Sequence, residues 1–112
     1  MTDARTTQLR RYRINEGELA VFTAWWRTRL VPAREAFGFR LEFAVTVPET
    51  DEFVWAVSAP GDAGAFAELD AAWAASPERV AAFAGEPVHV ASSDLRIATP
   101  SPDLPLGVRA AG

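Results

Sequence analysis

The sequence predicts an α+β domain in which the elements follow the order β-α-β-β-α-β. Large apolar residues occur at every second position in residues 39–47 and 53–59, as they do in β-strands. The two stretches follow each other in the middle of the chain. Stretches with helical spacing flank this pair, and one more strand-like stretch lies near each end. At 112 residues, the chain is long enough for one domain with a hydrophobic core.

The first part of the chain is expected to hold a strand and a long helix. Residues 7–14 form the predicted strand, with Tyr12 on one of its faces. Asn15 and Glu18 have the spacing of a capping box, which predicts a helix over about residues 16–36. The apolar stripe of this helix consists of Leu19, Phe22, Trp26, Leu30, Ala33 and Phe37.

Two features of this helix need explanation. Pro32 lies inside the helical pattern and should kink or break the helix near Val31, while Gly38 is placed to end it. Trp25 and Trp26 are consecutive, so their side chains point about 100° apart and one flat core cannot easily hold both. We expect Trp26 to face the core. Trp25 then either packs at the flank or a dimer interface, or forms the wall of an aromatic cleft.

The two central strands are expected to form a hairpin with two apolar faces. The residues of the first face are Phe39, Leu41, Phe43, Val45, Val47, Phe53, Trp55 and Val57. The residues of the second face are Ala44, Thr46, Val54, Ala56 and Ser58. A pairing of Val47 with Phe53 would produce this arrangement. Because helices would cover only one of these uncharged faces, a second copy of the chain should bury the other, giving a homodimer.

The sequence of the second half of the chain predicts a helix that is interrupted and then restarts. Residues 60–76 contain the first helix, with Asp62 as its N-cap. Ser76 then caps a short second helix that has Pro77 at its first position, and Gly85 closes it. The inward-facing residues expected in these two helices are Phe66, Leu69, Trp73, Val80 and Phe83.

The predicted domain ends with one more strand. Residues 88–98 form this strand, with a bulge expected at Ser92-Ser93. The domain therefore spans residues 7–99, between a disordered leader at 1–6 and a proline-rich tail at 100–112. This order of elements is that of a ferredoxin-like fold, in which a four-stranded antiparallel sheet carries helices on one face.

Composition excludes several classes of function. The net charge of −4 argues against binding to a nucleic-acid backbone, although Arg10, Arg11 and Arg13 cluster in the first strand. The chain has no cysteine, which excludes disulfides and thiolate chemistry. No apolar run approaches the roughly 20 residues of a membrane span, so no membrane partner and a cytoplasmic location are expected. All basic side chains are arginine and alanine is abundant, as in GC-rich genomes.

Three segments resemble the packing motifs of NIPSNAP-type domains. They are "QLRRYRINEGELAVFTAWW" with "LVPAREAFGF", then "AAWAASPERVAAF", and finally "SSDLRIATPSPDLP". The resemblance covers about residues 8–105 and implies a dimeric α+β barrel. That superfamily includes cofactor-free monooxygenases of antibiotic biosynthesis, heme-degrading enzymes, lactone isomerases and binding proteins, with a site between the sheet and the helices. The chain departs from the heme-degrading pattern, because neither long helix carries a histidine and the first strand offers Gln8 and Arg10 instead of asparagine.

Four side chains are candidates for catalysis. Tyr12 is the only tyrosine, and Arg10 shares its strand face, so together they could polarise an oxygen-rich substrate. His89 is the only histidine and Asp70 lies close to an apolar helical stripe. Three of them also have a structural interpretation: a packed tyrosine, a partly exposed strand histidine, and an aspartate that reaches water. The residues expected to bind substrate are Phe22, Trp25, Arg29, Trp55, Trp73 and Phe83.

These residues favour two hypotheses of function. In the first, the protein is a cofactor-independent enzyme of bacterial secondary metabolism that oxygenates, isomerises or cyclises an apolar or aromatic metabolite. In the second, it is a ligand-binding or structural homodimer without activity. A weaker third hypothesis is recruitment of a protein partner by the proline-rich tail. No cofactor is expected, and no cluster at ligand spacing predicts a metal site.

Overall fold

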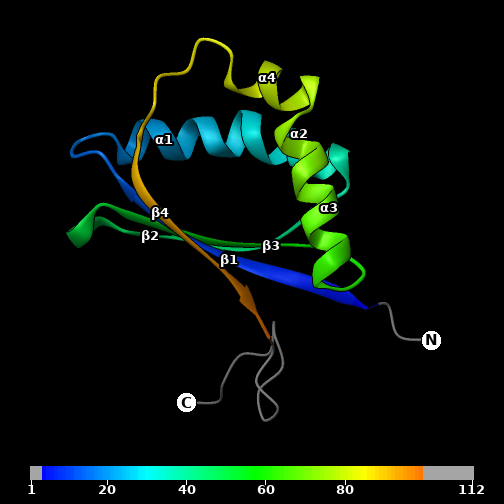
Figure 1. The fold of residues 1–112 in the computed structure, drawn as a ribbon. Coiled ribbons are helices and arrows are strands. Elements are labelled where there is room, and N and C mark those ends of the chain that lie inside the picture. The colour runs from blue at the N-terminus through cyan, green and yellow to red at the C-terminus, as the bar shows by residue number, and fades with distance from the viewer. Residues whose placement is uncertain (1–3, 100–112) are drawn as a thin grey trace.

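The computed structural model describes residues 4–99 as a four-stranded antiparallel sheet with its helices on one side (Figure 1). The strands are β1 (Arg5–Ile14), β2 (Arg40–Val47), β3 (Glu52–Pro60) and β4 (Val90–Ala98). The α-helices are α1 (Leu19–Trp25), α2 (Val31–Phe37), α3 (Ala63–Ala74) and α4 (Pro77–Phe83). A π-helical turn, η1 (Trp26–Leu30), joins α1 to α2, and a 3-10 turn, η2 (Pro48–Thr50), joins β2 to β3. The strand order β2-β3-β1-β4 confirms the predicted ferredoxin-like fold.

The ends of the chain differ partly from the expectation. Strand β1 begins at Arg5, two residues before the predicted start, so Arg5 and Thr6 belong to the sheet. Thr6 is buried, and its hydroxyl donates a hydrogen bond to the carbonyl of Gly61 at 2.9 Å. The rest of the predicted leader, apart from Ala4, and the predicted tail at 100–112 lie outside the described residues.

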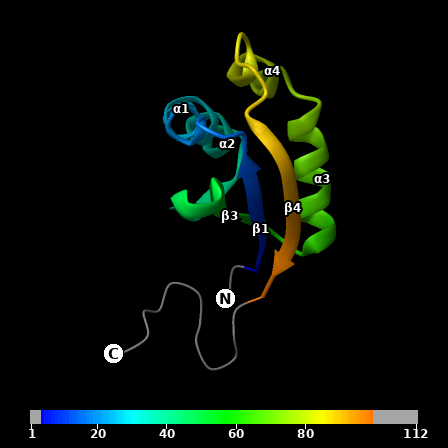
Figure 2. The same ribbon diagram turned by 90° about the vertical axis from the view of Figure 1, so that its left-hand side faces the viewer.

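The core lies between the helices and one face of the sheet. In the register of β1 against β3, Tyr12 pairs with Phe53 and Arg10 pairs with Trp55. The side chains of these pairs point toward the helices, where Phe22 packs on Phe53 with ring centroids 5.2 Å apart. Helix α4 lies at the end of the sheet where β1 ends and β4 begins (Figure 2).

A β-bulge at Glu42 divides strand β2 into two halves. Leu41 pairs with Val57, but Phe43 pairs with Ala56, so Glu42 is the extra residue. The Glu42 carboxylate accepts hydrogen bonds from the Ser58 hydroxyl at 2.6 Å and from the Arg40 guanidinium at 3.0 Å. Because one extra residue reverses the alternation of a strand, Phe43 and Val45 face the opposite way from Leu41.

The prediction that Phe39, Leu41, Phe43, Val45 and Val47 share one face is therefore wrong. Phe39 is buried among the helices, whereas Phe43 and Val45 are 41% and 50% exposed on the other face of the sheet, which we call the outer face. The expected pairing of Val47 with Phe53 is also wrong. Val47 pairs with Glu52 instead, and Thr46 takes the position opposite Phe53.

Both tryptophans of the first helix are buried, because two different layers cover the helix. Trp26 is 5% exposed and packs on Phe53 and Trp55 of the sheet, with ring centroids 4.8 and 5.4 Å apart. Trp25 is 7% exposed and packs on Phe83 of α4, with ring centroids 4.8 Å apart. Helix α4 thus supplies the second layer that the tryptophan pair needs.

The helix is irregular next to Pro32, close to the expected place near Val31, but the chain stays helical. The irregularity comes earlier, in η1, where the N–H of Val31 donates to the carbonyl of Trp26 five residues back. The chain then continues as α2 with Pro32 in its first turn, where the missing N–H of proline matters least. Gly38 ends α2 with a φ of 124°, as predicted.

The helices of the second half begin where the sequence predicts. The Asp62 carboxylate accepts from the N–H of Ala65 at 2.9 Å, and the Ser76 hydroxyl accepts from the N–H of Arg79 at 3.1 Å. Val80 was expected to face inward, but it is 67% exposed. The irregularity in β4 lies one residue earlier than predicted, at Ala91. Among residues 4–99, no helix is both long and apolar enough to cross a membrane.

Candidate functional site

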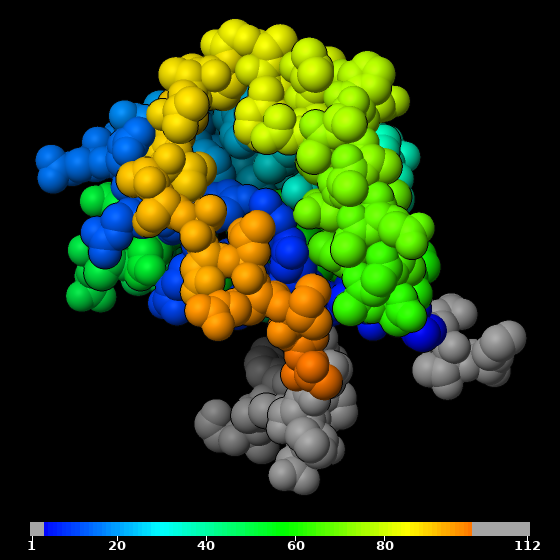
Figure 3. All heavy atoms as spheres, viewed as in Figure 1, coloured from blue at the N-terminus to red at the C-terminus, as the bar shows by residue number. Residues whose placement is uncertain are grey.

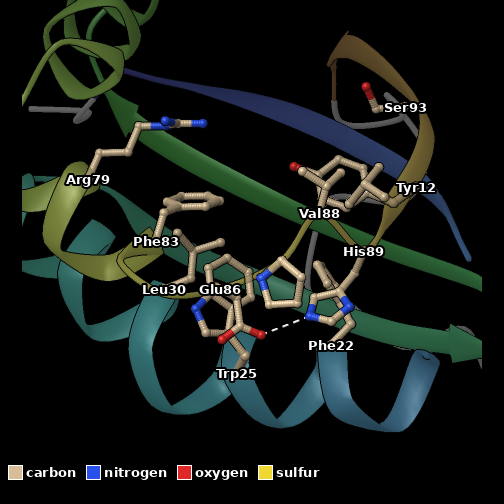
Figure 4. A pocket seen from close by; sticks show the side chains of 12 residues that line it. Tyr12, Phe22, Trp25, Leu30, Arg79, Phe83, Glu86, Val88, His89 and Ser93 are labelled. Carbon is tan, nitrogen blue, oxygen red and sulfur yellow. Dashed lines mark hydrogen bonds and ion pairs between the residues drawn. The ribbon is translucent and has the colours of Figure 1, made fainter.

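A cavity of about 330 Å³ lies beneath α4, between the first helix and the sheet (Figure 4). We call it the α4 cavity. Its apolar walls come mainly from Tyr12, Phe22, Trp25, Leu30, Phe83 and Val90. Its polar side chains are Arg79, Glu86, His89 and Ser93. This size falls at the lower end of the range for small-molecule sites, which is about 300–1,000 Å³.

The first helix holds α4 in place above the cavity. The indole N–H of Trp25 donates to the carbonyl of Ala82 at 3.0 Å. The Arg29 guanidinium donates to carbonyls at the C-terminal end of α4, the closest being that of Ala81 at 2.7 Å. Arg29 is exposed and does not line the cavity. It was expected to bind substrate, but its contacts are those of a residue that positions α4.

His89 lies in the cavity wall between two carboxylates. Its Nδ1 is 2.7 Å from Glu18 Oε1, and its Nε2 is 2.8 Å from Glu86 Oε2 (Figure 4 shows the second contact). The hydrogen bond with Glu18, and next that with Glu86, raises the pKa of His89 above its ordinary value. Both ring nitrogens are thus engaged, and the ring ties the segment after α4 to the start of α1. Without rearrangement, neither nitrogen is free to take a proton from a ligand.

This histidine also explains why the predicted capping box does not form. Glu18 is the residue before α1, but its carboxylate turns to His89. The amide nitrogen of Asn15 donates to the carbonyl of Val88 at 3.2 Å. Both side chains of the expected box therefore fasten the start of the helix to the chain just before β4.

Tyr12 presents the only phenol of the chain to the cavity. Its hydroxyl oxygen accepts a hydrogen bond from Arg10 Nε at 2.8 Å, and another N–H of Arg10 donates to the side-chain carbonyl of Gln8. The Arg10 guanidinium also lies 5.2 Å from the ring centroid of Trp55. Because the phenol oxygen already accepts from Arg10, its own hydrogen remains available to a ligand oxygen.

The other expected site residues lie away from the cavity. Trp55 and Trp73 are 1% and 2% exposed and belong to the core. Asp70 of α3 contacts Arg34 of α2, with Oδ1 3.4 Å from the guanidinium nitrogen. Of the ten expected residues, the structure therefore brings Tyr12, Phe22, Trp25, Phe83 and His89 together, with Arg10 directly behind Tyr12.

Sequence reasoning missed Arg34, which is 6% exposed and sits among aromatic rings. A signal was present, because Arg34 follows Trp26 and Leu30 at steps of four residues and so continues the apolar stripe. It also missed the carboxylates of Glu18 and Glu86. Within the described part of the chain, no group of three or more side chains of His, Cys, Asp or Glu could hold a metal ion.

The structure is that of a ferredoxin-like α+β domain with a small, partly open cavity between sheet and helices. Solved structures of NIPSNAP proteins share this fold. A family protein from Agrobacterium tumefaciens has a TM-score of 0.79 at 18% identity, over 92% of this chain and 99% of its own. A NIPSNAP domain protein from Burkholderia xenovorans has a TM-score of 0.75 at 19% identity, over 89% and 98%.

A candidate antibiotic biosynthesis monooxygenase from Bacteroides thetaiotaomicron is similar as well, with a TM-score of 0.61 at 20% identity over 96% of both chains. No protein-family model and no curated protein matches the chain in sequence. The likeness to the three solved structures shows a shared fold, and it confirms at that level the resemblance seen in the sequence.

Proposed function

We propose that this protein binds a small, mainly apolar molecule with a planar skeleton in the α4 cavity. The observation that supports this most strongly is the cavity of about 330 Å³ with aromatic walls on several sides. Phe22, Trp25 and Phe83 pack edge to face or tilted, so they present both ring faces and ring edges to a ligand. The proposed setting is the cytoplasm of a bacterium.

Two substitutions on neighbouring residues of β4 test this proposal. Ser93 lines the cavity, whereas Ser92 pairs with Arg13 and faces the outer side of the sheet. The neutral probe is 2-acetylnaphthalene, with binding measured by isothermal titration calorimetry. Ser93→Trp should fill the cavity mouth and weaken binding at least tenfold, while Ser92→Trp should leave the affinity within about twofold. Equal affinities in the two variants would show that the probe does not occupy the cavity.

The proposed activity is a cofactor-independent reaction, such as oxygenation, isomerisation or cyclisation of an apolar metabolite. Tyr12 is the group best placed for it, because its phenol can donate to a ligand oxygen while Arg10 holds it. The shared fold with a candidate antibiotic biosynthesis monooxygenase supports this assignment. The alternative, a binding protein without activity, is supported by His89, whose two ring nitrogens are both engaged by carboxylates.

Mass spectrometry of a bound metabolite separates these two functions. An enzyme would convert the metabolite, and Tyr12→Phe would retain binding but reduce conversion strongly, because it keeps the ring and removes only the hydroxyl. If the protein only binds the metabolite, the metabolite should be recovered unchanged from both the native protein and Tyr12→Phe. Conversion at the same rate by Tyr12→Phe would contradict the role assigned to the phenol.

We also propose that a second copy of the chain covers the outer face of the sheet. Phe43 and Val45 are exposed there, and Leu9 and Val54 are partly exposed on the neighbouring strands of the same face. Burial of such a patch favours association of two copies. Light scattering should give twice the chain mass for the native protein and for Val21→Glu, a control on α1. Val45→Glu should give the mass of one chain, and a dimer in that variant would contradict the proposal.

A further inference from the structure

Three buried N–H donors without acceptors adjoin one another beneath α2. Within residues 4–99, Trp26 Nε1, Arg34 Nε and Trp55 Nε1 are buried and have no hydrogen-bond partner. The rings of Trp26 and Trp55 lie 5.4 Å apart, and the Arg34 guanidinium lies 5.5 Å from the centroid of Trp55. Buried donors without partners are destabilising and uncommon. All three lack an acceptor, so a group that satisfied them would have to present oxygen atoms or negative charge.

The same place carries more positive than negative charge. Arg10 approaches Trp55 from β1 and Arg34 approaches it from α2, each within 5.5 Å of the ring centroid. Burial, and next the charge of Arg10, lowers the pKa of Arg34 to about 10, although Asp70 partly opposes this. Asp70 is the one carboxylate within ion-pair distance of either arginine among the described residues. Two guanidinium groups and one carboxylate leave one positive charge without a partner.

A recess between β4 and α3 lies over β1, the strand that carries Arg10. Figure 3 shows atoms of β1 at the floor of this recess, between the atoms of β4 and those of α3. Arg10 of β1 is partly exposed and pairs with Leu95 of β4, which is 42% exposed on the same face of the sheet. Asp70, the ion-pair partner of the buried Arg34, has a side chain that is 33% exposed. The recess therefore combines the partly exposed Arg10 with an apolar side wall, while Arg34 is buried next to the same Trp55 ring that Arg10 contacts.

One hydrogen bond links Arg10 to the wall of the α4 cavity. Tyr12 lines the cavity, and its hydroxyl accepts from Arg10. A ligand whose ring system lies in the cavity can thus place a group beside Arg10 without leaving the helix-facing side of the sheet.

We propose that Arg10 and Arg34 bind the acid group of the ligand, which is a monocarboxylate with an apolar ring system. This inference rests on the proposed function and names the class of ligand. A carboxylate is planar and pairs with a guanidinium through two parallel hydrogen bonds. Its single charge balances the one positive charge that Asp70 leaves, whereas a phosphate monoester carries a charge of about −1.5 to −2 at neutral pH. The exposed Leu95 and Ile97 suit the carbon skeleton next to the acid group.

The test compares 2-naphthoate with 2-acetylnaphthalene, which has the same rings and a neutral acetyl group in place of the acid. In calorimetry at pH 7, the native protein should bind 2-naphthoate at least tenfold more tightly than the ketone. Arg10→Met and Arg34→Met should each reduce this ratio toward one. Arg13→Met is the matched control, because Arg13 lies on the same strand, is exposed and faces the outer side of the sheet. It should leave the ratio unchanged.

Asp70→Asn provides a second measurement that does not depend on removing a buried arginine. It takes away the competing negative charge, so the ratio of affinities should rise severalfold. A fall or no change in the ratio would overturn the proposed acid site. Equal binding of both probes by the native protein would also overturn the proposed acid site. It would not contradict binding of the ring system in the α4 cavity.

Two further outcomes separate this inference from the proposed function. If Ser93→Trp leaves 2-naphthoate binding intact while Arg10→Met abolishes it, the acid site stands and the ring system lies outside the cavity. If the native protein binds neither probe, both proposals are overturned.

Discussion

Raising the pH from 6 to 9 is expected to destabilise the folded protein through His89. Its carboxylate partners Glu18 and Glu86 raise the pKa of His89 in the folded state. The folded state therefore holds the proton at pH values where the unfolded state, with an ordinary histidine pKa of about 6.5, has released it. The contribution to stability is fully present below pH 6.5 and is lost as the pH rises through the raised pKa.

The size of this loss follows from the contacts of the ring. A neutral imidazole carries one hydrogen, so one of the contacts at 2.7 and 2.8 Å would become a contact between two acceptors. A hydrogen bond to a charged group contributes about 1.5–3 kcal/mol. Glu18 is 39% exposed and partly screened by water, while Glu86 is 18% exposed. We therefore expect the free energy of unfolding to fall by about 2 kcal/mol across this range.

Urea denaturation followed by tryptophan fluorescence measures this effect. For a small domain, about 2 kcal/mol corresponds to a shift of about 1 M in the urea midpoint. The chain has one histidine and no cysteine, so no other ordinary side chain titrates in this range. His89→Gln should abolish most of the pH dependence. If this variant keeps the slope of the native protein, or if the native protein becomes more stable at high pH, the reasoning about His89 is refuted.

Three further substitutions test the structural assignments by the same denaturation assay. Trp73→Ala should cost about 3–5 kcal/mol, because Trp73 is 2% exposed in the core; a loss below 1 kcal/mol would contradict that placement. Ser76→Ala should lower the free energy of unfolding by about 1 kcal/mol, because the helix cap is lost. The control Ser92→Ala, at an exposed serine, should leave it unchanged. Gly61→Ala should cost about 1–3 kcal/mol, because φ is 95° and the added Cβ would lie 2.6 Å from Ala65 Cβ; an unchanged midpoint would show that the turn relaxes.

Features that depend on neighbouring residues were predictable from the sequence. The caps at Asp62 and Ser76 arise from side chains that bond to backbone groups three residues away, so their signal is local. The order of strands and helices likewise follows from periodicity and turn residues. On this basis the fold class was predicted correctly, and five of the ten expected site residues line the cavity, although their roles remain predictions.

The remaining errors have a common physical origin, which is contact between distant parts of the chain. The bulge at Glu42 is invisible in the sequence, because apolar residues still alternate along β2 while the pairing with β3 shifts by one. The carboxylate of Glu18 lies 71 positions before His89, and no local pattern links them. Arg34 was overlooked because a charged residue in an apolar stripe is ordinarily solvent-exposed, whereas here aromatic rings surround it.

The bulge in β2 also lets one short strand serve two independent purposes. Before Glu42, changes in side-chain size alter how Phe39 and Leu41 fill the interior. After it, changes at Phe43 and Val45 alter only what the sheet offers to a neighbour. Substitutions on the outer face can therefore be made within a few residues of the core without altering the walls of the α4 cavity on the opposite side of the sheet.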